Sequence, residues 1–154
     1  MTDEAMMREA VKLARKAASQ DEVPVGAVIV HQNRIIARAH NQVELLKDPT
    51  AHAEMIAITQ AASALSAKWL QDCTLYVTLE PCSMCAGALV LARINRICFG
   101  AWDPKAGACG SILNIAQNSR LNHRIEVLGG LLDTECGGLL SDFFEKKRAP
   151  RAAL

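Results

Sequence analysis

The sequence predicts an α/β fold in which one sheet is covered by helices on both faces. Segments with the apolar period of a helix alternate along the chain with short β-branched runs, which is the pattern of such sheets. The 154 residues are the length of one domain, and the chain contains no internal repeat, low-complexity tract or linker. We therefore expect residues 1–154 to form a single domain.

The first half of the chain predicts a helix, a hairpin and a second helix. Apolar residues recur at helical spacing near the N-terminus, and a short polar turn at 31–34 joins two β-branched runs. Pro49 and Thr50 then precede another helical segment. In order, we expect a helix over 4–18, strands over 25–30 and 35–39, a loop over 41–48 and a helix over 51–65.

The second half predicts two more strand–helix steps around a long loop. Pro81 favours the first position of a helix, whereas Gly137 and Gly138 weaken the last helix. We expect strands over 75–79, 96–100 and 125–128, helices over 81–93 and around 132–143, a loop over 101–124 with a short helix near 112–117, and a polar, frayed tail over 146–151.

Composition and charge exclude several classes of protein. Seventeen basic and 16 acidic residues give a net charge of +1, so the overall charge would not hold nucleic acid, although a local basic patch could. No apolar run approaches the roughly 20 residues of a membrane span, and the acidic N-terminus does not resemble a signal peptide. We expect a cytoplasmic protein without membrane contact. Its scattered cysteines Cys73, Cys98, Cys109 and Cys136 should not form disulfides, and most of them should be small buried side chains.

Two short segments carry residues suited to a metal site. Cys82 and Cys85 lie three apart, so both sulfurs share one face at the start of a predicted helix, where thiol pKa values fall. Alone, such a pair also fits a redox site, structural zinc or chance. His52, at the start of a different helix, adds a nitrogen ligand, and two cysteines with one histidine suit tetrahedral Zn²⁺. Three protein ligands leave a fourth position for water, whose pKa zinc lowers to about 7.

Glu54 has a separate predicted role. Positions i and i+2 do not share a helix face, so Glu54 is poorly placed to bind the same metal as His52. It can still border the pocket, where a carboxylate would take a proton from the activated water and return it to the substrate. The alternative is a first-turn glutamate that only complements the helix dipole.

Together these residues resemble the zinc-dependent cytidine and nucleobase deaminase superfamily, whose pattern is H-x-E followed by P-C-x-x-C. Within it, the chain resembles the bacterial tRNA adenosine deaminases over nearly its whole length. The stretches that carry this resemblance are 22–28, 50–54, 75–82, 85–88, 107–111, 122–124 and 140–144.

The resemblance implies a three-layer α/β/α cytidine-deaminase-like fold with a five-stranded mixed sheet, one Zn²⁺ per chain and a homodimer. It implies hydrolytic deamination of adenosine to inosine at the wobble position of a tRNA anticodon, by zinc-activated hydroxide with Glu54 as the proton shuttle. It further implies that five residues contact the substrate: Asn41 and Ala53 at the nucleoside, Val25 as an apolar wall, Asp103 at the anticodon strand and Phe144 near the RNA path. Trp102 stands where an arginine is common in the family, and residues 42–47 have little of the usual arginine content.

RNA contacts and two rival functions remain open from the sequence. The candidates for a basic patch are Lys105, Arg120, His123, Arg124 and the tail cations from Lys146 to Arg151, each of which could instead be a solvated surface residue. One rival is a deaminase of free bases or nucleosides, such as guanine or cytosine. The other is a non-catalytic RNA-binding module around a structural zinc, which would need Cys109 or Cys98 as a fourth ligand.

Overall fold

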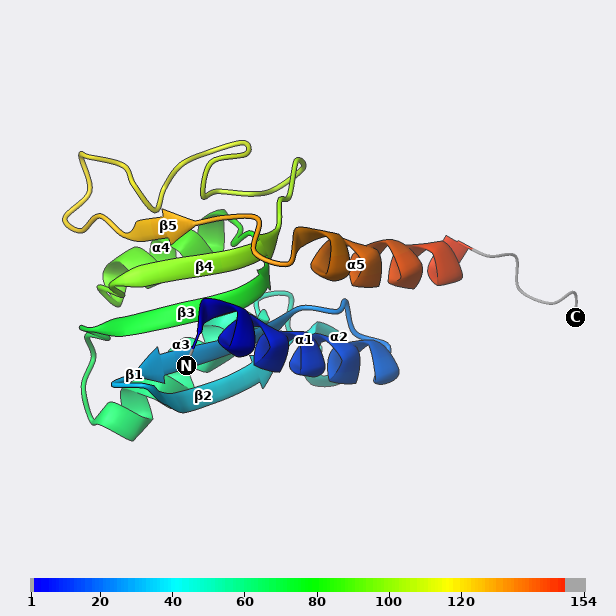
Figure 1. The fold of residues 1–154 in the computed structure, drawn as a ribbon, viewed down its shortest axis with the longest axis horizontal. Coiled ribbons are helices and arrows are strands. Elements are labelled where there is room, and N and C mark those ends of the chain that lie inside the picture. The colour runs from blue at the N-terminus through cyan, green and yellow to red at the C-terminus, as the bar shows by residue number, and fades with distance from the viewer. Residues whose placement is uncertain (1, 149–154) are drawn as a thin grey trace, which may run out of the picture.

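The computed structural model describes residues 2–148 and contains one five-stranded mixed sheet (Figure 1). Its strands are β1 (Gly26–His31), β2 (Arg34–His40), β3 (Cys73–Leu79), β4 (Arg96–Ala101) and β5 (Glu126–Leu128), in the order β2-β1-β3-β4-β5. Strand β1 runs antiparallel to both neighbours, whereas β3, β4 and β5 are mutually parallel. The mixed five-stranded sheet is as predicted.

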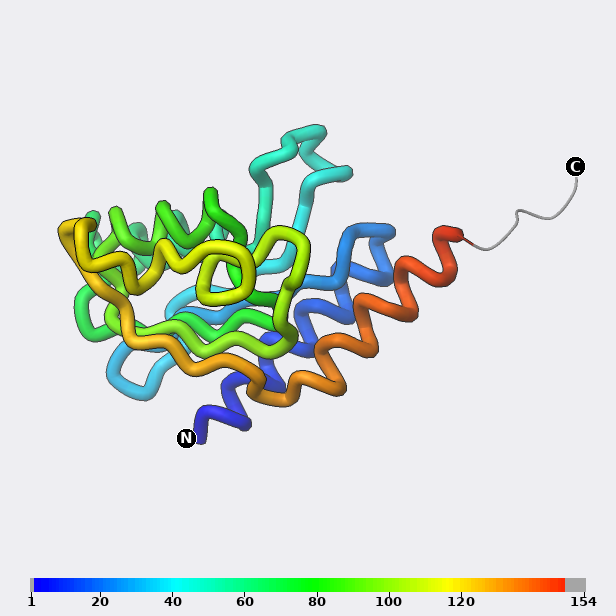
Figure 2. The backbone as a smooth tube through the Cα atoms, turned by 90° about the horizontal axis from the view of Figure 1, so that it is seen from above, coloured from blue at the N-terminus to red at the C-terminus, as the bar shows by residue number. Residues whose placement is uncertain are grey.

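Helices cover both faces of this sheet, so the three-layer arrangement is confirmed (Figures 1 and 2). The helices are α1 (Asp3–Ser19), α2 (Val43–Leu46), α3 (Ala53–Leu65), α4 (Ser83–Leu91) and α5 (Asp133–Arg148). Helices α1 and α5 pack on one face through a cluster that includes Met7, Val28 and Cys136. Helices α3 and α4 pack on the other face in a larger cluster that includes Ala57, Val77 and Leu89.

Tertiary hydrogen bonds explain two wrong predictions in the loops. The helix expected near 112–117 does not form, because Ile115 N–H donates to Ala108 O, and Gly110 N–H donates to Leu113 O. These bonds replace the i to i−4 pattern of a helix. Conversely, the loop expected over 41–48 contains α2, whose Glu44 and Leu45 N–H groups donate to the Glu22 carboxylate.

The helix ends also differ slightly from the predictions. Helices α3 and α4 each begin two residues later than expected, with His52 and Cys82 as extended N-cap residues, so Pro81 precedes the cap. Residues 146–148, expected to fray, form the last turn of α5, and the rest of the predicted tail lies outside the described residues.

The remaining composition-based expectations concern cysteines and membranes. All six cysteines are free, and the four scattered ones are buried, as predicted. Among residues 2–148, no helix is long and apolar enough to cross a membrane.

The ends of three strands meet at one edge of the sheet and position the site. Strand β1 begins there, β2 ends there before Asn41, and β3 ends there before Glu80. The N-termini of α3 and α4 point to the same edge, since His52 and Cys82 cap them beside each other.

Candidate active site

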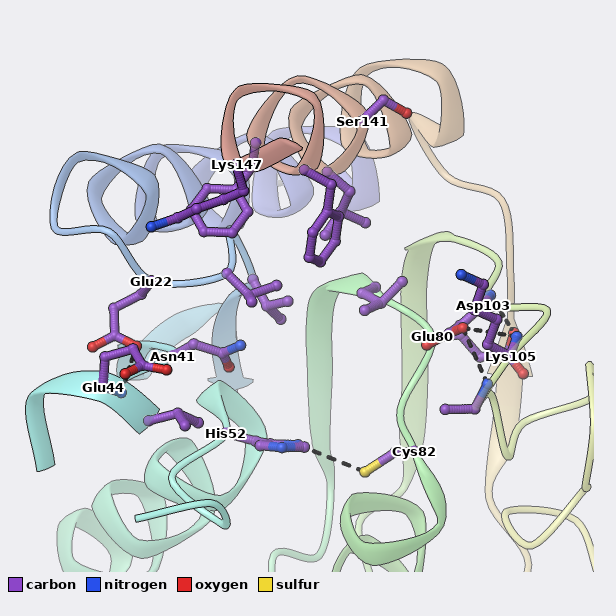
Figure 3. A pocket seen from close by; sticks show the side chains of 18 of the residues that line it. Glu22, Asn41, Glu44, His52, Glu80, Cys82, Asp103, Lys105, Ser141 and Lys147 are labelled. Carbon is purple, nitrogen blue, oxygen red and sulfur yellow. Dashed lines mark hydrogen bonds between the residues drawn. The ribbon is translucent and has the colours of Figure 1, made fainter. Parts of the chain in front are cut away.

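One imidazole and two thiols converge between α3 and α4. His52 Nδ1 lies 3.6 Å from Cys82 Sγ and 3.5 Å from Cys85 Sγ, and Figure 3 shows His52 and Cys82 facing each other at the floor of a cleft. The ligand atoms of all three lie within 4.8 Å of one another. In the described part of the chain, this is the only such group of histidine, cysteine or acidic residues, so Cys98 and Cys109 do not join it.

The electrostatics of this cluster favour the thiolate form of Cys82. Hydrogen bonding from the Cys85 thiol, and then from His52, outweighs burial and lowers the pKa of Cys82 to about 3. The pKa of Cys85 is raised, first by that same hydrogen bond and then by burial. Hydrogen bonding to Cys82 raises the pKa of His52. A nitrogen and two sulfurs that share protons at this spacing are a donor set that Zn²⁺ fits, because the metal replaces the protons.

Glu54 lies in the first turn of α3 and lines the same cleft as His52 and Cys82. Its side chain is buried, and burial raises the pKa of Glu54 to about 7. A carboxyl group with that pKa can both accept and donate a proton near neutral pH, which general acid–base chemistry requires.

Asn41 connects the start of β1 to the start of α3. Its Oδ1 accepts a hydrogen bond from Ala53 N–H at 2.8 Å, and its own N–H donates to Val25 O at 3.1 Å. The Asn41 side chain lines the cleft (Figure 3) together with Val25. Ala53 is fully buried and its N–H is already used by Asn41.

The cleft is open and has a volume of about 1410 Å³. In Figure 3 one wall carries Glu22, Asn41 and Glu44, the opposite wall carries Glu80 and Asp103, and α5 lies above. Asp103 follows β4 and its carboxylate accepts from the N–H groups of Lys105 and Ala106. Phe144, on α5, also lines the cleft. All five predicted substrate residues are therefore in or next to this cleft.

The predicted basic residues divide between two ends of the molecule. Lys105, Lys147 and Arg148 line the cleft, and Lys147 pairs with Asp21 at 2.8 Å. His123 lies instead at the opposite edge of the sheet, where its Nε2 is 2.6 Å from Ile94 O just before β4.

Comparison with known proteins identifies the family. The MafB19-like deaminase family matches residues 1–148. The tRNA-specific adenosine deaminase of Bacillus subtilis (strain 168) is 52% identical, over 98% of this chain and 94% of that protein. The chain belongs to the tRNA-specific adenosine deaminase family. A solved structure from work on A-to-I editing by tRNA:A34 deaminases at the wobble position has a TM-score of 0.85 and 44% identity, covering 88% of this chain and 99% of that one.

A guanine deaminase is a more distant relative. The solved guanine deaminase from Bacillus subtilis is 32% identical with a TM-score of 0.66, over 100% of this chain and 99% of that one. The chain is thus closer to the tRNA-specific adenosine deaminases than to this free-base deaminase, although both share the fold.

Sequence reasoning gave no role to Glu80, which organises the wall opposite Asn41. Glu80 is 1% exposed. It accepts backbone N–H bonds from Asp103, Cys109 and Ser111 at 2.9–3.1 Å and a bond from the Ser111 hydroxyl. A Cβ on Gly107 would collide with the Glu80 carboxyl, so any larger residue there would have to displace that side chain. The signal in the sequence that could have indicated this role is the position of Glu80 directly before Pro81 and Cys82.

Glu22 organises the other wall of the cleft, which carries Asn41 and Glu44. Its buried carboxylate accepts from Glu44 N–H at 2.9 Å and Leu45 N–H at 2.8 Å. Both walls of this tRNA-specific adenosine deaminase family site are therefore held by buried carboxylates that bind backbone donors.

Proposed function

We propose that this chain hydrolyses adenosine to inosine, with release of ammonia, at the wobble position of a tRNA anticodon. The observation that carries the proposal is the His52, Cys82 and Cys85 cluster beside buried Glu54, in a chain of the tRNA-specific adenosine deaminase family. An unpaired anticodon loop also lets the target base leave its stack at low cost.

The cluster would hold one Zn²⁺ through His52, Cys82 and Cys85. When bound, zinc would lower the pKa of a water molecule, so that hydroxide is available at neutral pH to attack C6 of adenine. Glu54 would take a proton from the attacking water and give it to N1 of the ring, then take the second proton of the same oxygen and give it to the departing amine. Burial raises the pKa of Glu54, so its carboxyl group holds a proton more readily than a carboxyl group in water would.

Substitutions in the cluster separate metal binding from proton transfer. Cys82→Ala should lose both bound zinc and turnover, whereas Glu54→Gln should keep one zinc per chain and lose turnover. Metal content by elemental analysis and inosine formation are measured on the same samples. Turnover retained in Glu54→Gln would remove Glu54 from the mechanism.

The substrate would lie along the cleft from this floor to α5. Asn41 has Nδ2 left to bind the nucleoside because its Oδ1 is used by Ala53, whose N–H it orients. Val25 supplies an apolar wall, Asp103 meets the anticodon strand and Phe144 lies along the RNA path. Lys105, Lys147 and Arg148 are the basic residues best placed to reach phosphates, since they line the same cleft.

The rival function, a free-base deaminase, has support from the guanine deaminase relative. The deciding experiment incubates the protein with a tRNA carrying adenosine at the wobble position and, in parallel, with free guanine, cytosine and adenosine. Inosine at the wobble base, with no ammonia from the free compounds, supports tRNA editing. Ammonia from guanine with unchanged tRNA would establish the rival function.

We propose that the chain forms a homodimer and that the outer surfaces of α3 and α4 form its interface. No charged residue occurs over 55–67 or 81–92, and Leu91 at the end of α4 is 80% exposed. A helical layer without charges on its solvent side is typical of an interface. Leu91→Glu should shift the protein from dimer to monomer in sedimentation, whereas Leu45→Glu, at another exposed leucine (67%) on α2, should not. A monomeric wild type would contradict the proposal.

Two broader expectations belong to the same proposal. Residues 1–154 would form a single deaminase domain, supported by the match of the deaminase family over 1–148. The reaction would occur in the cytoplasm, where the six free cysteines stay reduced.

A further inference from the structure

Trp102 is a half-exposed aromatic side chain at the rim of the cleft. It follows β4 directly, lines the cleft beside Asp103 and is 51% exposed. Tryptophan carries the largest apolar surface of any side chain, and leaving half of it in water gives up a large part of the stabilisation that burial would supply. About half of its surface is therefore free to contact a ligand in the cleft.

The ring of Trp102 is nevertheless held firmly on its protein side. Phe99, buried in β4, meets it edge to face with ring centroids 4.7 Å apart and an interplanar angle of 89°. Gly129 and Gly130, which follow β5, leave room for the ring, because a Cβ on Gly129 would lie 2.8 Å from its Cζ2 and one on Gly130 3.4 Å from its Nε1. The indole thus packs against glycine backbone and Phe99.

The backbone beside the ring is fixed as well. Asp103 N–H donates to the buried Glu80 carboxylate at 2.9 Å. Further along the same loop, Gly107 pairs with Cys82 as an isolated bridge. The loop that starts with Trp102 is therefore tied to the metal cluster, so the ring keeps a constant position relative to the cleft floor.

A fixed aromatic ring with exposed surface beside a nucleic-acid cleft is suited to stacking with an unpaired base. The target base has to reach the floor, where His52, Cys82 and Glu54 lie. The rim is open to a neighbour in the same strand. We propose that Trp102 is an RNA-binding residue that stacks on the nucleobase next to the one that is deaminated. The inference rests on the proposed RNA substrate and adds to it a contact outside the reacting base.

Tryptophan fluorescence reads this contact directly, since the chain has only two tryptophans. Trp69 stacks under the Arg93 guanidinium, 4.2 Å from Cζ to the ring centroid, and does not line the cleft. In Trp69→Phe the emission therefore comes from Trp102 alone. Titration with an anticodon stem-loop RNA carrying the target adenosine should quench that emission saturably. The matched variant Trp102→Phe, which emits from Trp69, should show no such quenching.

A cycle with abasic RNA tests whether the contact contributes to affinity. Trp102→Leu should bind the stem-loop about 5- to 150-fold more weakly, which is 1–3 kcal/mol at about 1.4 kcal/mol per tenfold, whereas Trp102→Phe should lose less. An abasic nucleotide on one side of the target adenosine should weaken binding by wild type but cause no further loss in Trp102→Leu. The side on which this occurs identifies the stacked neighbour.

The outcomes distinguish this inference from the proposed function. If wild type edits the stem-loop but Trp69→Phe shows no quenching, and neither abasic RNA couples to Trp102→Leu, the stacking contact is refuted and the function stands. If wild type neither binds nor edits the RNA, the proposed function fails and the stacking contact fails with it.

Discussion

Replacing Glu80 tests how strongly one buried carboxylate holds the loop between Trp102 and Ser111. Glu80→Ala removes the acceptor for three backbone N–H groups and one hydroxyl. A buried donor left without a partner costs about 1–3 kcal/mol. The loop can move to let some of these donors reach water, so we expect a total loss of about 3–5 kcal/mol, below the full sum for four unpaired donors.

Glu80→Gln should cost much less. An amide oxygen in the place of Oε2 would still accept from Cys109 and Ser111 N–H, and the Ser111 hydroxyl can turn to accept from the new NH₂ group. Only Asp103 N–H would then be left facing a donor. One unsatisfied N–H predicts a loss of about 1–3 kcal/mol.

Urea unfolding of the zinc-loaded variants measures both losses. Burial acts to raise the pKa of Glu80. Hydrogen bonds from Ser111 and from backbone N–H groups outweigh this effect and hold the pKa below its usual 4.5. The carboxylate's contribution is therefore complete above about pH 4.5 and is lost as the pH falls through the folded-state pKa. The gap between wild type and Glu80→Gln should narrow on acidification. Equal unfolding midpoints for all three proteins at pH 7 would refute this role of Glu80.

Three further substitutions test neighbouring contacts. Asn41→Ala leaves the buried Ala53 N–H without its acceptor, so it should destabilise the fold by about 1–3 kcal/mol and raise KM for RNA; unchanged KM and stability would contradict this. Gly107→Ala should disturb the loop as Glu80→Ala does, because the new methyl group meets the Glu80 carboxyl; wild-type thermal stability would argue against that packing. Hydrogen bonds from Arg96 and Tyr76 lower the pKa of Asp3 to about 2, so Asp3→Asn should lower the free energy of unfolding by about 1 kcal/mol after screening by water. This difference in stability should be complete above about pH 4 and fade towards pH 2. A stability difference that does not change with pH would be inconsistent with these hydrogen bonds.

The cluster was predictable because its chemistry depends on local spacing. Cys82 and Cys85 are three residues apart, so they share one face at the start of a helix. The residues that flank His52 and Cys82 predict that a helix begins at each of them. The strands were predictable for a similar reason, since β-branched runs bounded by turn residues carry a local signal.

The predictions missed at α2 and at Glu80 involve partners distant in sequence. Helix α2 depends on the carboxylate of Glu22, which lies 22 residues before Glu44. The helix expected near 112–117 is replaced by pairing of Ile115 with Ala108, which no periodicity reveals. The role of Glu80 depends on Ser111, 31 residues away. The contacts of Glu22 and Glu80 exist only once the fold has brought these segments together.

X-ray absorption at the zinc edge tests the central claim most directly, because it counts the ligand atoms around the metal. The account predicts one zinc per chain with two sulfurs and one imidazole nitrogen, matching Cys82, Cys85 and His52, and light atoms completing the coordination. Glu54→Gln should give the same spectrum while forming no inosine. A third sulfur in the wild-type spectrum would mean a closed structural site and would contradict the account.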